Sequence, residues 1–343
     1  MTSEFSDLDN QLNKLKRLMK KCQNILNALS FAAEDLQNHI YLVSECKIHE
    51  KLVQLLHINC PESLNCQNKL NLPNLIQTQQ LQTALFRALT SLSQFDRPVI
   101  LFLVQDNNIL NHLIDIIVKF SSSLQTNTNQ STQSIQNKNI NKNLQGETIV
   151  PSEALELLYF IILGSRQFVE LLSPNMELIP ALISISYFKR YEKEQIQIES
   201  QISEGLQQSQ YKNNIISRIR RQSIECLGSL QYYGGQKLQE QLVNEFRYVF
   251  ALLDGIGVCG GSHEFDSEVI HQSCSNLSHV FFLFHEGRSP CPELPVLLKT
   301  VGELTEQEGG LEEIEAHLHH TLDLSGDKVK YFAASAKSSI FKY

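Results

Sequence analysis

A repeated pattern of apolar residues constrains the fold of this chain more than any other feature. The apolar positions of segment 41–56 recur 61 residues later in segment 102–117, whereas the polar residues between them differ. The first copy carries Tyr41-Leu42-Val43, Ile48, Leu52-Val53 and Leu55-Leu56, and the second carries Phe102-Leu103-Val104, Ile109, Leu113-Ile114 and Ile116-Ile117. An apolar skeleton with variable polar residues is typical of stacked helical repeats, whose units bury their faces against one another. The pattern therefore predicts an all-α chain.

About five such units can be identified between residues 22 and 305, and each is expected to hold a long helix, a short helix and a second long helix. The first long helices carry residues 27–31, 87–91, 156–160, 225–229 and 275–279. The second long helices carry the segments that begin at Ile48, Ile109, Leu178, Tyr248 and Glu293. Pro180 and Pro295 occupy equivalent places, in a first turn that tolerates proline. Asn107-Asn108 precedes the corresponding helix of the second unit, and asparagine can adopt the left-handed conformation that a tight turn requires.

The third unit, from Glu153 to Ser186, resembles the armadillo repeat. It contains an Ala-Leu-x-x-Leu pattern in 154–158, apolar pairs in 168–172 and the sequence Leu-Ile-Pro-Ala-Leu-Ile in 178–183. The resemblance implies a right-handed, armadillo-like α-solenoid of about five degenerate repeats over residues 1–310, with polar loops inserted between helices. HEAT-type arrays give similar patterns, so the choice between the two subfamilies stays open.

Three segments depart from the repeat pattern. In segment 121–147, 19 of 27 residues are Ser, Thr, Asn or Gln, which predicts a disordered low-complexity insertion. Segment 190–214 is rich in Gln, Glu and Lys and is expected to be a polar linker or a long solvated helix. Segment 311–343 contains two amphipathic patterns, which indicate helices that either cap the end of the stack or form a docking tail.

Composition excludes several classes of function. The net charge is −8 and no strong basic block is present, which argues against nucleic-acid binding. No apolar run approaches the roughly 18–20 residues that a membrane span needs. The first residues are polar and acidic, unlike a secretory signal, so the eight cysteines are expected to be reduced and mostly packed between helices. We therefore expect a cytoplasmic protein, and leave nuclear or cytoskeletal association open.

Two groups of residues could in principle carry chemistry. Segment 255–260 reads Gly-x-Gly-x-x-Gly and also places Cys259 in a Gly-x-Cys-x-Gly sequence near His263, but a helix rather than a strand is predicted before it. His271 and Cys274 lie one helical turn apart, without a second pair of metal ligands nearby in the sequence. We therefore expect no catalytic residue, no cofactor and no bound metal.

The armadillo resemblance also implies a binding groove, because the first long helices of that family line a concave surface. The residues at the corresponding positions are Asn27, Phe31, Arg87, Ser91, Glu156, Phe160, Glu225, Ser229, Ser275 and His279. The nuclear-import adaptors of that family carry a ladder of Trp and Asn there, and this chain has no tryptophan, which argues against recognition of import signals. Phe31 and Phe160 would be core residues instead if the helical register were shifted by one position.

The leading hypothesis is a non-enzymatic adaptor or scaffold that binds a segment of another protein through this concave face. The alternative is an obligate structural subunit of a larger cytoskeletal or organellar assembly, and a remote alternative is an enzyme that uses the Gly255–His263 loop. The sequence Arg220-Arg-Gln-Ser223 matches the preference of basophilic kinases, so Ser223 is a candidate phosphosite.

Overall fold

The structure is a computed structural model of the 343-residue chain. It describes residues 2–94, 96–105, 108–130, 140–164, 166–172, 175–188, 206–257, 266–288, 291–319 and 326–342. Within these ranges every extended regular element is a helix, and the only β-type pairings are two isolated bridges, Ile58 with Leu70 and Arg288 with Cys291. The predicted all-α class is therefore confirmed.

No helix in the described part of the chain combines the length and the hydropathy that crossing a bilayer requires.

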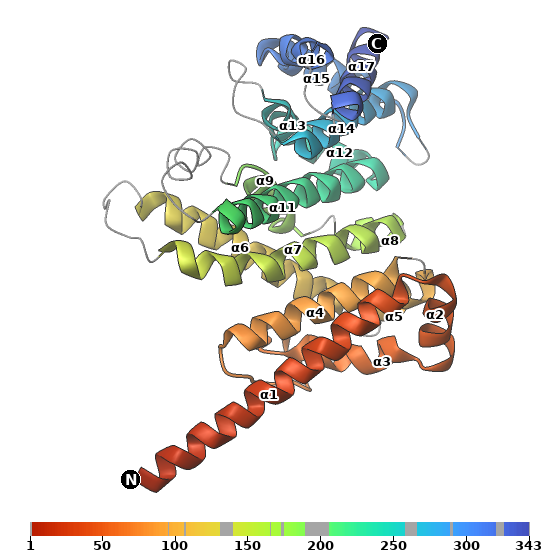
Figure 1. Cartoon of the computed structure of the whole chain (residues 1–343). Coiled ribbons are helices and arrows are strands. Elements are labelled where there is room, and N and C mark those ends of the chain that lie inside the picture. Colours follow the sequence, from red (N-terminus) through yellow and green to blue (C-terminus); the bar gives the residue numbers. More distant parts are fainter. Residues whose placement is uncertain are drawn as a thin grey trace. The chain divides into compact units, whose positions relative to one another are not determined.

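Each predicted unit begins with a long helix, but the full order of long, short and long elements is found only over residues 76–130 (Figure 1). The second helices that begin at Leu178 and Tyr248 have nine residues each, and the described residues hold no short helix between Glu286 and Pro295. The first long helices are α1 (Thr2–Ala33), α4 (Ile76–Ser93), α7 (Ile140–Gly164), α11 (Leu206–Tyr233) and α14 (Ser267–Glu286). The short helices are α2 (Leu36–Ile40), α5 (Arg97–Gln105), α8 (Arg166–Leu172) and α12 (Gln236–Asn244). The second helices of the units are α3 (Ile48–Leu52), α6 (Ile109–Gln130), α9 (Leu178–Ser186), α13 (Tyr248–Ile256) and α15 (Pro295–Gln307). The chain ends with α16 (Gly310–Leu318) and α17 (Gly326–Lys342).

The first repeat, which holds α1, α2 and α3, differs from this scheme in detail. Its second helix is only five residues long and continues as the 3-10 helix η2 (Val53–His57), and a π-helical turn, η1 (Tyr41–Glu45), follows α2. A further 3-10 turn, η3 (Glu62–Leu64), lies in the connection to α4.

A backbone feature recurs immediately before three of the second helices. Lys47, Asn108 and Arg247 have φ angles of 48°, 53° and 58°, and they directly precede α3, α6 and α13. The left-handed conformation is confirmed for Asn108, and the other two positions show that the turn does not depend on asparagine. This conformation costs roughly 1–2 kcal/mol for a residue other than glycine, so its recurrence indicates that helix packing imposes the same turn each time.

The chain divides into two compact units, and the first contains residues 1–120 and 133–164. Within it, α4 packs between α1 and α7, which lie side by side with it in Figure 1. The Ser30 and Ser91 hydroxyls are 2.8 Å apart where α1 meets α4, and an Arg87 Nη atom lies 2.7 Å from a Glu153 carboxylate oxygen where α4 meets α7. Leu89 and Leu158 are fully buried in this core.

The second unit contains residues 121–132 and 165–343. Here α14 packs against both α11 and α17, and α11 also packs against α9. The Asn276 side chain on α14 donates to the Ile224 carbonyl oxygen on α11 at 2.9 Å, and His317 Nε2 on α16 donates to the Ile256 carbonyl oxygen on α13 at 2.7 Å. The two C-terminal helices are thus bonded and packed onto the preceding helices of the same unit.

Two polar segments are described only in part. Segment 121–147 is predicted to be disordered, but α6 continues through Gln130 and α7 begins at Ile140, while residues 131–139 lie outside the described residues. Extending a helix that is already nucleated costs far less than starting one, so α6 can continue into polar residues. In segment 190–214, α11 begins at Leu206, and the residues before it also lie outside the described part.

Candidate functional site

The predicted groove residues of the first compact unit are exposed to very different degrees. Asn27 and Arg87 are exposed, and the Phe31 side chain is 77% exposed, so Phe31 is not a core residue. Glu156 and Phe160 are half-buried, whereas Ser91 is buried against Ser30. Only some of the predicted groove residues therefore lie on the surface of this compact unit.

The same positions of the second unit are also mixed. Glu225 is half-buried and lies 3.2 Å from Arg221 one helical turn earlier, and Ser229 is buried. Ser275 is half-buried, and the exposed His279 ring lies 5.8 Å from the ring of Tyr232.

Ser223, the candidate phosphosite, is fully buried in α11. Its hydroxyl donates to the Leu182 carbonyl oxygen on α9, and Arg220 Nε donates to the Ser186 carbonyl oxygen at 2.9 Å. A kinase cannot reach this hydroxyl in the folded chain, so the phosphosite interpretation is corrected. The motif resembled a kinase site because sequence alone does not show which side of a long helix faces the core.

The glycine-rich segment 255–260 also has a structural role in its described part. Gly255 lies inside α13, where a Cβ atom would collide with the Ser273 hydroxyl of α14, and Gly257 ends the helix with a φ of 106°. The preceding element is a helix, whereas a dinucleotide-binding loop follows a strand. Cys259 and His263 lie outside the described residues.

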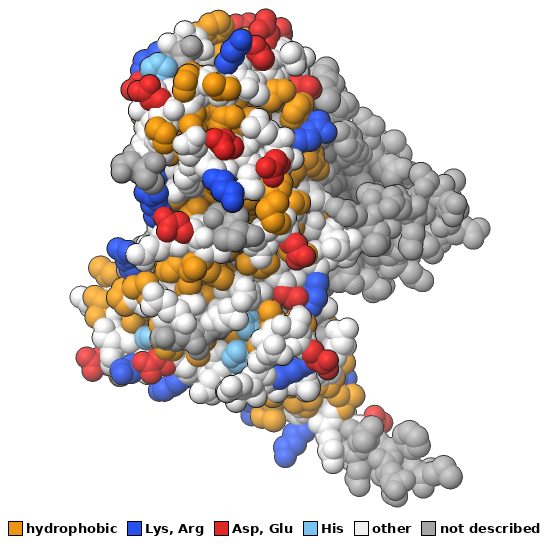
Figure 2. All heavy atoms as spheres, turned by 180° about the vertical axis from the view of Figure 1, so that it is seen from behind, with side chains coloured by type: hydrophobic (Ala, Val, Ile, Leu, Met, Phe, Trp, Pro, Cys, Tyr) orange, Lys and Arg blue, Asp and Glu red, His pale blue; other side chains and the backbone are white. Residues whose placement is uncertain are grey.

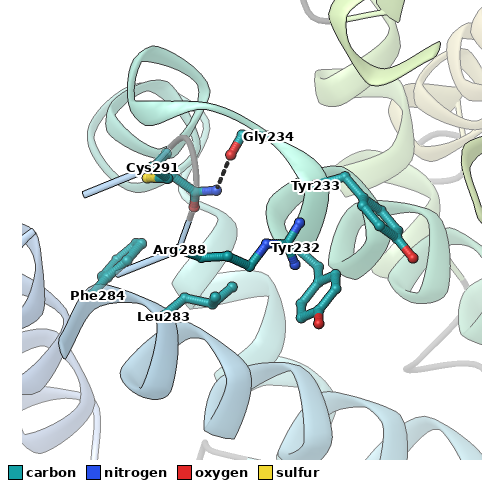
Figure 3. Close-up of a pocket in the computed structure, with 8 residues that line it drawn as sticks. Tyr232, Tyr233, Gly234, Leu283, Phe284, Arg288 and Cys291 are labelled. Carbon is teal, nitrogen blue, oxygen red and sulfur yellow. Dashed lines mark hydrogen bonds between the residues drawn. The ribbon is translucent and has the colours of Figure 1, made fainter. Parts of the chain in front are cut away.

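One shallow pocket lies in the second unit, around the turn that follows α11 (Figure 3). It is lined by Tyr232, Tyr233, Gly234, Gln239, Leu283, Phe284, Arg288 and Cys291. The Arg288 guanidinium lies 3.9 Å from the centroid of the Tyr232 ring, and the Gln239 amide donates to the Gly234 carbonyl oxygen at 3.2 Å. The space enclosed by these side chains is about 10 Å³, room for about one water molecule, whereas typical ligand sites have roughly 300–1,000 Å³. These contacts hold the turn together rather than leave polar groups free for a ligand.

The structure also brings together four side chains that the sequence analysis did not connect: His57, Cys60, Cys66 and His112. One potential ligand atom from each residue lies within 4.8 Å of those of the other three. His57 ends η2, Cys60 and Cys66 lie on either side of η3, and His112 lies in the first turn of α6. Cys60 and His112 are buried, whereas His57 and Cys66 are half-buried.

The contacts within this His/Cys cluster centre on His112. Its Nδ1 atom lies 3.5 Å from Cys60 Sγ, and its Nε2 atom lies 3.5 Å from Cys66 Sγ. The Nδ1 atom of His57 lies 3.9 Å from Cys60 Sγ, and the two imidazole rings meet edge to face with centroids 5.2 Å apart. Each thiol also approaches a carbonyl oxygen, Leu56 at 3.5 Å and Leu64 at 3.8 Å, respectively.

Burial sets the protonation states in this cluster. Burial, with a hydrogen bond between Cys60 and Cys66 as the second cause, raises the pKa of the Cys60 thiol to about 12. Burial and the nearby His57 lower the pKa of His112 to about 4. His112 is therefore neutral at physiological pH, the form in which imidazole binds metal ions.

A backbone framework fixes the connection that carries the two cysteines. The Asn59 amide donates to the Leu70 carbonyl oxygen at 2.9 Å, and the Leu70 amide donates to the His57 carbonyl oxygen at 2.9 Å. The Leu72 amide donates to the Asn59 side chain at 2.8 Å, and the Gln82 side chain donates to the Ile58 carbonyl oxygen at 3.2 Å. These hydrogen bonds fix the backbone before Cys60 and after Cys66, so the segment that carries both cysteines is held at its two ends.

Sequence inspection missed this cluster because it searched for a Cys-x-x-Cys pair and for paired ligands close in sequence. The available signal was the spacing His57-x-x-Cys60, with Cys66 six residues later. His112 could not be assigned to it, because 46 residues separate it from Cys66 and only the packing of α6 brings it near.

Charged side chains of both signs are interspersed on the face drawn in Figure 2, among exposed hydrophobic side chains. This face of the described residues therefore carries no single-sign field of the kind that attracts a phosphate backbone.

Comparisons with known proteins give information on the fold of the chain and none on its function. No protein-family model matches the chain, and no curated protein matches it. A solved structure of an engineered protein, determined by the Northeast Structural Genomics Consortium, is similar with a TM-score of 0.54 at 14% identity. The match covers 97% of each chain, and at this identity it shows a likeness of fold alone.

Proposed function

We propose that this chain is a non-enzymatic, armadillo-like scaffold that binds a segment of a partner protein. The proposal is supported by the packing of α1 on α4 and of α4 on α7, which are first helices of successive predicted units. Such arrays present an extended surface formed by successive first helices. The observation that carries the proposal is Phe31, a large aromatic side chain that is 77% exposed at one of the predicted groove positions.

Exposed aromatic residues of this kind often act as anchors in protein interfaces. Tyr, Trp and Arg side chains dominate binding energy there, and aromatic side chains in general bury a large area when a partner covers them. Asn27, one helical turn before Phe31, and Arg87 on α4 are also exposed at predicted groove positions. The Arg87 guanidinium is already engaged by Glu153, so we expect it to orient the surface more than to bind the partner.

The test is capture of partner proteins from the native cell by three variants, quantified by mass spectrometry. Phe31→Ala is expected to weaken capture of the specific partner by about 30-fold, which corresponds to about 2 kcal/mol for an interface anchor. Phe341→Ala is the matched control, because Phe341 on α17 is similarly exposed at 66% and lies in the other compact unit. Unchanged capture by Phe31→Ala, or an equal loss with Phe341→Ala, would reject the proposed surface.

A second function, that of an obligate subunit of a larger assembly, is favoured by another face of α1. Leu18 and Ile25 are 50% and 60% exposed, and with the exposed Cys22 they form a stripe at positions i, i+4 and i+7. At 100° per residue this stripe lies on a different side of the helix from Phe31. A repeat array normally covers its terminal apolar face, so an exposed stripe suits a permanent partner.

The third variant, Leu18→Ser with Ile25→Ser, distinguishes the two functions in the same capture experiment. If this variant loses the partner and Phe31→Ala retains it, the subunit function is favoured. If the opposite is found, the scaffold function stands.

A further inference from the structure

We propose that His57, Cys60, Cys66 and His112 form a structural zinc site in the first compact unit. This inference does not depend on the proposed scaffold function. It rests on the convergence of four metal-binding side chains from η2, from the connection that follows it and from the start of α6.

The four potential ligand atoms lie near the separations that a tetrahedral zinc ion requires. Zinc binds sulfur at about 2.3 Å and imidazole nitrogen at about 2.0–2.1 Å, so tetrahedral ligand atoms lie about 3.3–3.8 Å apart. His112 can give one ion only one of its ring nitrogens, so only one of its two 3.5 Å contacts, to Cys60 or to Cys66, can be an edge of the tetrahedron. His57 Nδ1 lies 3.9 Å from Cys60 Sγ, and one ligand atom from each of the four residues can be chosen so that all lie within 4.8 Å of one another. Binding an ion would require the ligand atoms to approach by up to about 1 Å, and two of the four side chains, His57 and Cys66, are only half-buried.

The ligand set indicates both the ion and the type of site. Two thiolates and two imidazoles are the Cys₂His₂ set of structural zinc sites, and a tetrahedral S₂N₂ arrangement selects zinc over harder cations. Four protein ligands fill the tetrahedron and leave no open position for water, unlike a catalytic zinc site. Two thiolates also balance the charge of the divalent ion, which allows it to lie in a partly buried place.

A zinc ion here would connect two elements that are distant in the chain. Residues 57–72 have little regular structure and are tied to each other mainly by the hydrogen bonds around Asn59 and Leu70. His112 belongs to α6, the second long helix of the next unit. The ion would therefore fasten the connection to α6, to which Cys60 and Cys66 are joined by weak thiol contacts with the His112 ring nitrogens.

Two alternative states of the cluster give different observable results. Cys60 and Cys66 could form a disulfide, which would lower the mass of the chain by two hydrogen atoms and leave no thiolate for a metal. The four side chains could also pack together as neutral groups, in which case added zinc would bind weakly and to variants as well.

The experiment uses the full-length chain, stripped of metal by a chelator under reducing conditions and then exposed to Zn²⁺. One tightly held ion per chain is expected after gel filtration, measured by plasma mass spectrometry. Cys60→Ser and His112→Ala are each expected to lower the affinity by at least about 100-fold, beyond the 10–100-fold effect of changes outside the first ligand shell. Cys46→Ser is the matched control, because Cys46 is a half-buried thiol of the same unit outside the cluster, and this variant is expected to retain the ion.

A measurement on the unaltered chain keeps the test valid even if a variant fails to fold. Thiol alkylation with and without Zn²⁺, mapped by mass spectrometry, is expected to show zinc-dependent protection of Cys60 and Cys66 and none of the exposed Cys22. Cobalt substitution should give the absorption bands of a tetrahedral ion with thiolate ligands. A native Cys60–Cys66 disulfide, zinc lost on gel filtration, or alkylation of both cysteines that is unaffected by zinc would each overturn the proposal.

Discussion

Replacing Leu158 with alanine is expected to lower the free energy of unfolding by about 2–5 kcal/mol, because the change removes a fully buried side chain and leaves a cavity. The same loss is expected at Leu89, Leu227 and Leu277, which occupy the equivalent position of other units and are also fully buried. Leu29, the equivalent residue of the first unit, is only half-buried, so Leu29→Ala should cost clearly less. Urea unfolding followed by circular dichroism measures each effect.

The loss of unfolding free energy should be found in the compact unit that contains the substituted leucine. Leu89 and Leu158 belong to the first unit, and Leu227 and Leu277 belong to the second. A loss of stability from Leu29→Ala as large as that from Leu158→Ala would contradict the alignment of the repeats. It would mean that α1, the first helix of the first repeat, is packed on both sides.

Substitution of two helical glycines is expected to change stability in opposite directions. Gly255→Ala should destabilise the chain by about 1–3 kcal/mol, because the new Cβ atom meets the buried Ser273 side chain where α13 approaches α14. Gly302→Ala should stabilise it by about 0.5–1 kcal/mol, because no atom lies within 4 Å of the new Cβ atom and alanine favours the helix α15.

Thermal or chemical unfolding of the two glycine variants side by side gives the comparison. A stabilising effect of Gly255→Ala would mean that α13 and α14 are not in close contact there. Such a result would also reopen the question of why the glycine-rich segment 255–260 exists.

Most of the helical elements could be predicted from the spacing of apolar residues. The spacing placed Leu89, Leu158, Leu227 and Leu277 at equivalent positions, and all four are fully buried in the structure. It succeeded because each long helix buries one stripe against its neighbours, and a stripe leaves a clear period in the sequence. The solenoid arrangement of the whole chain stays a prediction, as does its assignment to the armadillo family.

Features that depend on contacts between distant segments could not be predicted in this way. Cys60 and Cys66 lie in an irregular connection without a period, and His112 joins them only because α6 packs beside that connection. Burial of Ser223 and exposure of Phe31 likewise depend on which side of a helix meets its neighbour. A shift of one residue rotates a helical position by 100°, which is enough to exchange a surface residue for a core residue.

The most direct test of the account is an engineered disulfide between corresponding helices of successive units. The Ser30 and Ser91 hydroxyls are 2.8 Å apart, so cysteines at these positions can form a disulfide bond of about 2.05 Å with small side-chain rotations. The variant Ser30→Cys with Ser91→Cys is expected to yield one linked pair of peptides by mass spectrometry, with unchanged helical content. Leu18→Cys with Ser91→Cys, which uses an exposed side of α1, should yield no such link. Absence of the peptide pair linked through positions 30 and 91, or equal linkage in the control, would contradict the stacking of α1 on α4 on which the account depends.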